Sequence, residues 1–292
     1  MCNTDEKLGM GWLPDYPDFR DYTEGHDEIS SALKPTRILR SKLKTPSSVD
    51  LRQWCSPVDN QLTIGSCTAH AGVGMVEYYE KRAFGKYIDA SRLFLYKTTR
   101  NLIHFSGDTG AFLRSAMGAL VLFGVPPEEY WPYNIADFDK EPTAFCYAFA
   151  QNYQAIKYFR HDPSATPKDV LLDRIKKYLA AGHPSMFGFA VYSSIEQSVK
   201  TGQIPFPCKG EKIAGGHAVT AVGYDDKMKI KNTGSCGKET KGALLIRNSW
   251  GAGWGDAGYG WLPYEYVLTG LAEDFWSITK KEWIDTGEFT SS

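Results

Sequence analysis

The sequence lacks the features that mark membrane proteins and secreted proteins. It has no run of eighteen apolar residues, so it predicts no transmembrane helix. Residues 1–7 contain neither the basic region nor the apolar region of a secretory signal. We therefore expect no membrane partner and a cytoplasmic location by default, while export by another route or a signal trimmed from the chain stays open.

An excess of charge is also lacking. The 33 basic side chains nearly balance the 34 acidic ones, which gives a formal net charge of −1. A protein that binds nucleic acid through a strongly basic surface is therefore not expected. The six cysteines form no C-x-x-C pair, which argues against a structural zinc site, and we expect neither a metal nor another cofactor. A disulfide could join Cys208 to Cys236, but the sequence leaves open the pairing among Cys2, Cys55, Cys146, Cys208 and Cys236.

Helical periodicity dominates the first half of the chain, and strand patterns dominate the second. Helices are predicted from Cys67 to about Phe84, at 91–97, at 111–123 and from a cap at Thr166 to about Ala181. Alternating apolar runs predict strands at 185–192, 217–224, 243–248 and 258–261, and a polar hairpin or loop at 225–242. This order favours an α+β protein with two lobes. Residues 47–152 would form the helical lobe, and residues 153–292 the strand-rich lobe with the C-terminal tail.

Cys67 is the first candidate for chemistry. It follows Gly65-Ser66 and begins a predicted helix, where unpaired N–H groups and the helix dipole favour an anion. A thiol held there has a lowered pKa and forms the nucleophilic thiolate more readily. An isolated cysteine in a helix is more often a buried structural residue, so this position alone leaves both interpretations open.

Two distant stretches supply the partners that a cysteine nucleophile needs. His217 opens the strand pattern at 217–224, and Asn248 ends the pattern at 243–248. A nucleophilic thiol requires a base beside it and a third group that orients the base. An imidazole and a neutral amide on neighbouring strands can fill these two roles. His70, one helical turn from Cys67, is better explained as a structural histidine.

These residues carry a resemblance to a known family. The string Asn248-Ser249-Trp250-Gly251, followed by Trp254-Gly255 and Gly258-Tyr259, together with Gln61, Cys67 and His217, resembles the papain-like cysteine proteases over residues 46–265. The resemblance implies a papain-like two-lobe fold, with a helical left lobe, a β-barrel-like right lobe and the active site in the cleft between them. It also implies a cysteine endopeptidase that acts on peptides or proteins, and we expect a monomer.

The resemblance assigns roles to particular residues. Cys67 and His217 would form a thiolate–imidazolium pair, and Asn248 would orient the imidazole. Gln61 would belong to the oxyanion hole, and Trp250 would cover the bond between His217 and Asn248. Gly110, Trp250 and Gly216 would contact the substrate. The bottom of the main specificity pocket would come from residues 271–274.

The sequence departs from the family in three places. Ile64 occupies the position of a cysteine that is usually bridged, and Thr68 replaces the tryptophan that usually follows the nucleophile. Residues 1–46 are much shorter than the long helical pro-segments of many relatives and show no matching helical pattern. They would act either as an inhibitory pro-segment, which would make the protein a zymogen, or as a surface strap.

Alternative functions stay open at this stage. A papain-fold protein can lose its activity and serve as a binding protein, and the same chemistry can transfer the acyl group to an amine. Two smaller expectations concern charge. Arg247 is expected to be a solvated charge, and Glu77 is expected to pair with Lys81 one turn later.

Overall fold

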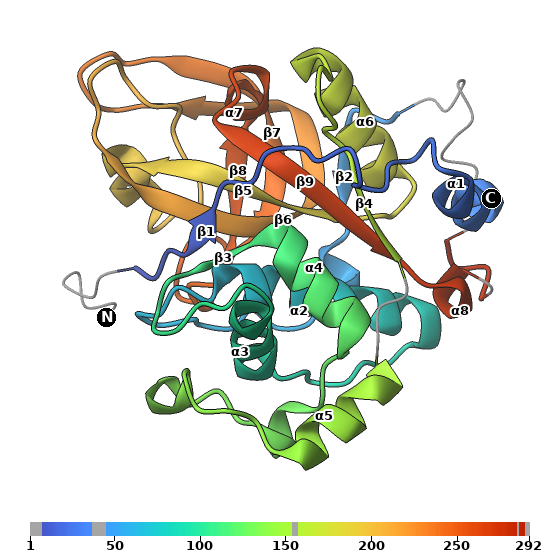
Figure 1. Ribbon diagram of the computed structural model, residues 1–292. Helices are drawn as coiled ribbons and strands as arrows, with labels where there is room; N and C mark the ends of the chain where they lie inside the picture. Colours follow the sequence, from blue (N-terminus) through green and yellow to red (C-terminus); the bar gives the residue numbers. More distant parts are fainter. Residues whose placement is uncertain (1–7, 37–44, 154–156, 285, 290–292) are drawn as a thin grey trace.

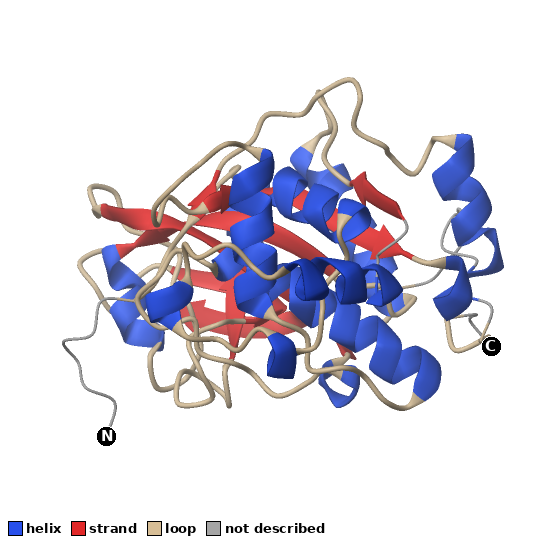
Figure 2. Ribbon diagram, turned by 60° about the horizontal axis from the view of Figure 1, so that its bottom comes forward, coloured by secondary structure: helices blue, strands red, loops and turns tan. Residues whose placement is uncertain are grey.

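The computed structural model describes residues 8–36, 45–153, 157–284 and 286–289. Helices α2 to α5 gather below the strands in Figure 1, and the view in Figure 2 shows helices lying in front of the sheet. No helix in the described part of the chain is long and apolar enough to span a membrane. The α-helices are α1 (Asp27–Leu33), α2 (Cys67–Phe84), α3 (Arg92–Leu102), α4 (Leu113–Leu122), α5 (Ala144–Ala150), α6 (Lys168–Ala180), α7 (Tyr264–Leu268) and α8 (Lys281–Ile284).

The strands form one large sheet and one short pair. The large sheet has the order β4-β9-β5-β6-β7-β8, with β2 paired beside β6. The expected barrel-like lobe is wrong in this respect, because β4 and β8 lie at opposite ends of the sheet and closure requires the two edge strands to pair. The strands are β1 (Trp12–Leu13), β2 (Ser48–Asp50), β3 (Ala111–Phe112), β4 (Lys157–Arg160), β5 (Ser185–Tyr192), β6 (Ile213–Lys231), β7 (Glu239–Arg247), β8 (Tyr259–Pro263) and β9 (Ala272–Thr279).

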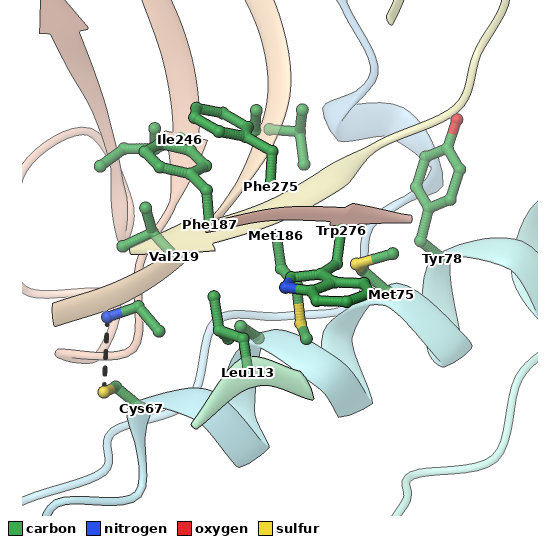
Figure 3. Close-up of a cluster of buried hydrophobic side chains, with 14 of the residues drawn as sticks. Cys67, Met75, Tyr78, Leu113, Met186, Phe187, Val219, Ile246, Phe275 and Trp276 are labelled. Atoms are coloured by element: carbon green, nitrogen blue, oxygen red, sulfur yellow. Dashed lines mark hydrogen bonds between the residues drawn. The ribbon is translucent and has the colours of Figure 1, made fainter. Parts of the chain in front are cut away.

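Helix α2 packs between the sheet and the other helices. Gly72 lets the side chains of Leu95 and Leu120 approach, because a Cβ there would lie 3.2 Å and 3.3 Å from their methyl carbons. Gly74 likewise makes room for the guanidinium of Arg247. Figure 3 shows side chains of the sheet pointing toward α2 and α4, with Cys67 at one end of this core.

Most of the predicted elements are confirmed, and several were missed. Helix α2 and strand β5 have the expected bounds, and β6 and β7 form the expected hairpin across residues 225–242. Helix α6 is capped by Pro167 rather than Thr166, whose hydroxyl instead donates to Pro163 O. The sequence patterns missed the strands β1, β2, β4 and β9 and the short helices α1, α5, α7 and α8. Strand β3 lies at the start of the helix that was predicted at 111–123. The division into lobes at residues 47 and 153 stays a prediction.

An N-terminal strap, defined here as residues 8–22, runs in front of the strands of the large sheet in Figure 1. Its β1 pairs in parallel with β3, and Trp12 lies opposite Ala111. Further along, Tyr22 O accepts from the backbone N–H of Arg160 at the end of β4. The strap thus contacts segments that follow it by 111 − 12 = 99 and 160 − 22 = 138 residues.

Candidate active site

Cys67 lies at the first position of α2 and is fully buried. The turn before it is closed by a hydrogen bond from Ser66 N–H to Ile64 O. The thiol sulfur accepts from the backbone N–H of Ala218, at 3.4 Å, and from that of Gly11 in the strap. The residue after His217 therefore reaches the sulfur directly, which brings the candidate nucleophile and the strand of the candidate base together.

Asn248 fixes both the orientation and the tautomer of His217. Its Oδ1 accepts from the backbone N–H of Ser249 at 2.8 Å, so the amide is held with its oxygen toward the ring. His217 Nε2 lies 2.7 Å from the same oxygen, and because Oδ1 can only accept, Nε2 carries the proton. His217 Nδ1 has no hydrogen-bond partner among the described residues. This nitrogen is therefore left with a lone pair and can accept a proton.

Trp250 covers the bond between His217 and Asn248. Its ring stacks on the imidazole with centroids 4.4 Å apart and an interplanar angle of 21°. The indole N–H points the other way and donates to Gly9 O in the strap at 3.0 Å. The stacking keeps water away from the His217–Asn248 hydrogen bond, and the low local polarity strengthens that bond.

Gln61 lies beside this group and is held on three sides. Its backbone N–H donates to Ser249 O at 2.8 Å, and its Oε1 accepts from Ser249 Oγ at 2.5 Å. Its Nε2 donates to Ile64 O at 2.9 Å. An amide nitrogen carries two N–H groups, so one of them is left for a ligand. Ser249 thus orients Gln61, a role that the sequence did not suggest.

The three expected substrate-binding residues all touch the strap. A Cβ on Gly110 would overlap the carbonyl of Gly11, and one on Gly216 would lie 2.5 Å from Trp12 O. The third residue, Trp250, holds the carbonyl of Gly9. On the opposite side, the backbone N–H of Ala111 donates to Gly11 O at 2.8 Å. Backbone of the strap therefore lies against all three residues that were expected to contact the substrate.

Burial controls the charge of the candidate pair in this form of the protein. It raises the pKa of the Cys67 thiol to about 11, against which the backbone N–H groups act only weakly. Burial also lowers the pKa of His217 to about 4, although the bond to Asn248 acts in the opposite direction. A neutral thiol and a neutral imidazole are therefore favoured here. The expected thiolate–imidazolium pair stays a prediction, and burial in this form acts against it.

Two expectations about charge are wrong. Arg247 is buried, and its guanidinium donates to Ser56 Oγ at 2.9 Å and to Pro57 O at 2.6 Å. Glu77 pairs with Arg92 at 3.0 Å instead of with Lys81, because it lies inside the core, where an unpaired carboxylate is costly. Arg247 thus joins the segment before Gln61 to the strand before Asn248.

The cysteines separate into two classes. Cys208 and Cys236 form a disulfide, whereas Cys55, Cys67 and Cys146 are free and buried. Cys2 lies outside the described residues. Ile64, at the position of the missing cysteine, packs in the main core. The described chain therefore uses apolar packing where many relatives use a bridge.

Comparison with known proteins places this arrangement in a family. The model of the papain family cysteine proteases matches residues 45–276. The chain belongs to that family. This papain-family chain is therefore a cysteine-type peptidase, with peptides or proteins as substrates, and the matched region begins after the strap.

Relatives of this peptidase include viral and bacterial proteins. An uncharacterised peptidase C1-like protein of Acanthamoeba polyphaga mimivirus is 32% identical, over 92% of this chain and 86% of its own length. Xylellain, a cysteine protease from Xylella fastidiosa, is 33% identical, with a TM-score of 0.74 over 96% of this chain and 99% of xylellain. Cathepsin K of Gallus gallus is 27% identical, over 74% of this chain and 58% of its own.

The structure also brings in Trp12 and Ser249, to which the sequence assigned no role. Trp12 donates to Asp274, which lies in the stretch 271–274 expected at the specificity pocket, and Ser249 braces Gln61. The glycines at positions 9 and 11 were the available signal for the strap. Glycine at every second position of an extended segment allows close approach of backbone on one face.

Proposed function

We propose that this peptidase cleaves peptide bonds through Cys67, with His217 as general base and acid. His217 Nδ1 takes the proton of the Cys67 thiol, and the resulting thiolate attacks the carbonyl carbon. The C–N bond then breaks, and the same nitrogen delivers the proton to the leaving amine. Water attacks the resulting thioester, His217 takes a proton from it, and the carboxylic acid leaves as the thiol is restored.

Asn248 is the orienting group and Gln61 an oxyanion donor. Because Asn248 Oδ1 accepts from Nε2–H of His217 at 2.7 Å, Nδ1 is the nitrogen that exchanges the proton with Cys67 and the leaving amine. Gln61 Nε2 has a second N–H beyond the one used by Ile64 O, and this N–H would stabilise the negative oxygen together with the backbone N–H of Cys67. The ion pair forms when water and substrate replace the strap, because the pKa of Cys67 then falls and that of His217 rises.

The strap inhibits this activity in the intact chain. It contacts Gly110, Gly216 and Trp250, and Gly11 N–H caps the sulfur of Cys67. Gln61 Nε2 donates to Ile64 O and not to a strap carbonyl, so the strap is not seated as a peptide to be cleaved. It lies ahead of the region that the family model matches, as an inhibitory segment would.

The observation that carries the proposal is the Asn248–His217–Trp250 arrangement, which leaves a lone pair on His217 Nδ1. The residue after His217, Ala218, donates its backbone N–H to the sulfur of Cys67 at the start of α2. The test is hydrolysis of fluorogenic peptides by the full-length chain carrying Gly11→Ala, a change that destabilises the seated strap. Adding Cys67→Ala should abolish hydrolysis, whereas adding Cys55→Ala should not. Equal turnover with and without Cys67 would refute the assigned nucleophile.

A further inference from the structure

Trp12 occupies a side-chain pocket next to the nucleophile. Its neighbour Gly11 donates to the sulfur of Cys67, so Trp12 enters the first pocket along the groove from that point. The indole is buried, and its N–H donates to Asp274 Oδ2 at 3.1 Å. The chain therefore carries its own example of a side chain that fits this pocket, and a substrate preference inferred from it rests on the proposed peptidase mechanism.

The walls of the pocket are shaped for a flat, wide ring. A Cβ on Gly188 of β5 would overlap carbon atoms of the indole, and a Cβ on Gly216 of β6 would lie 3.0 Å from ring atom Cε3. Strand interiors seldom contain glycine, because it weakens the strand and offers no side chain to pack. Two glycines on paired strands, facing one indole, make a slot for an aromatic side chain.

The carboxylate of Asp274 forms the floor of the pocket, and its charge is balanced by Arg160. Asp274 Oδ1 accepts from Trp276 Nε1 at 2.7 Å and lies 3.1 Å from Arg160 Nη1, so only Oδ2 faces the occupant. Arg160 also pairs with Asp162 at 3.0 Å, and Arg114 lies over the same Trp276 ring. Without the strap, the guanidiniums of Arg160 and Arg114 would remain near the carboxylates of Asp162 and Asp274. Burial also raises the pKa of Asp274 to about 7, which weakens its attraction for a cation.

We propose that the enzyme prefers substrates that place an indole in this pocket, where the indole N–H donates to Asp274 Oδ2 as that of Trp12 does. A basic side chain would meet a floor that Arg160 has neutralised, and it would lose its own hydration. An aromatic ring without an N–H would fill the slot but leave Asp274 Oδ2 unpaired. A buried acceptor without a partner is costly, so the N–H distinguishes tryptophan from rings of equal size.

The test uses the full-length chain carrying Gly11→Ala and fluorogenic peptides in which every amino acid lies on the acyl side of the bond that is cleaved. Tryptophan, 2-naphthylalanine or arginine is placed either next to the leaving group or one residue further away. Naphthalene has nearly the size of indole but lacks the N–H. At one of the two positions, kcat/KM for tryptophan should exceed that for naphthylalanine about tenfold or more, and should also exceed that for arginine.

Asp274→Asn serves as the matched variant, because asparagine has the same shape and tolerates the left-handed backbone that Asp274 adopts at φ +65°. It should bring the tryptophan-to-naphthylalanine ratio toward one. A ratio near one in the chain with Asp274, at both positions, would overturn the proposal. A preference for arginine would overturn it as well.

A binding measurement separates this proposal from the proposed function. A fluorescent peptide copying residues 8–14 is titrated into the same Gly11→Ala chain, with tryptophan or naphthylalanine at the place of Trp12. Tighter binding of the tryptophan peptide, by about tenfold, would support the pocket even if no peptide were hydrolysed. Equal affinities would overturn the pocket assignment even if hydrolysis were fast.

Discussion

Replacing Gly11 with alanine should displace the strap from the groove and expose Cys67. A Cβ at this position would overlap the backbone of Gly65, which closes the turn before α2 and cannot move without shifting Cys67. Overpacking of this kind typically costs about 1–3 kcal/mol, which raises the population of the open strap about 5- to 150-fold. Gly25→Ala is the control, because the nearest atom to its Cβ would be Thr23 Oγ1 at 3.8 Å.

The assay is the rate of iodoacetamide alkylation at Cys67, followed by peptide mass spectrometry on the full-length chain. In the unaltered chain the thiol pKa of about 11 keeps the sulfur protonated, so the rate should be low and should rise with pH up to about pH 11. With Gly11→Ala, Cys67 should react quickly even near pH 5.5, because the exposed pair with His217 provides thiolate there.

The two variants should behave differently. Gly25→Ala should match the unaltered chain at every pH, and the buried Cys55 and Cys146 should stay slow in all three proteins. If Gly11→Ala labelled Cys67 no faster than Gly25→Ala, the strap would not be what shields the sulfur. Fast labelling of the unaltered chain at pH 5.5 would refute the neutral pair.

The site and its surroundings support three further predictions. In the Gly11→Ala background, Gln61→Ala should lower kcat about 10²- to 10³-fold while Cys67 can still be alkylated; unchanged turnover would reject the oxyanion role. Arg247→Met should lower the free energy of unfolding by about 3–5 kcal/mol in urea titrations, because it leaves buried acceptors and Glu77 without this cation; a change below about 1 kcal/mol would contradict the buried network. Burial lowers the pKa of four histidines below the value in the unfolded chain. Their contribution to the free energy of unfolding is therefore complete above about pH 6.5 and is lost as the pH drops toward 4, by about 1 kcal/mol per histidine at pH 5.5. A melting temperature that stayed constant from pH 7 to 5 would contradict this prediction. These histidines are His70, His161, His183 and His217.

Local patterns in the sequence, together with the family resemblance, predicted the elements that carry the candidate site. Helix α2 begins at Cys67 as predicted, and β6 and β7 deliver His217 and Asn248 to one place because antiparallel pairing sets their register. The roles of Cys67, His217, Asn248 and Gln61 stay predictions until they are tested by substitution. Their mutual placement agrees with the pattern from which they were inferred.

What the sequence could not predict depends on long-range burial. Arg247 looks like a surface charge by its type, and only the folded chain shows that Gly74 leaves it a buried space. The pKa shifts of Cys67 and His217 likewise depend on their burial in the folded chain. The pocket of Trp12 is built from Gly188, Gly216 and Asp274, which lie far apart in the sequence. No local periodicity could predict that they meet.

The most direct test of Cys67 as the nucleophile is to trap the acyl-enzyme. The full-length chain carrying Gly11→Ala is mixed with a peptide ester, quenched in acid within milliseconds, and examined by intact mass and peptide mapping. The proposed mechanism predicts one acyl group on the peptide that contains Cys67, and none when His217→Ala is added. An acyl group on another residue, or hydrolysis that continues after Cys67→Ala, would contradict it.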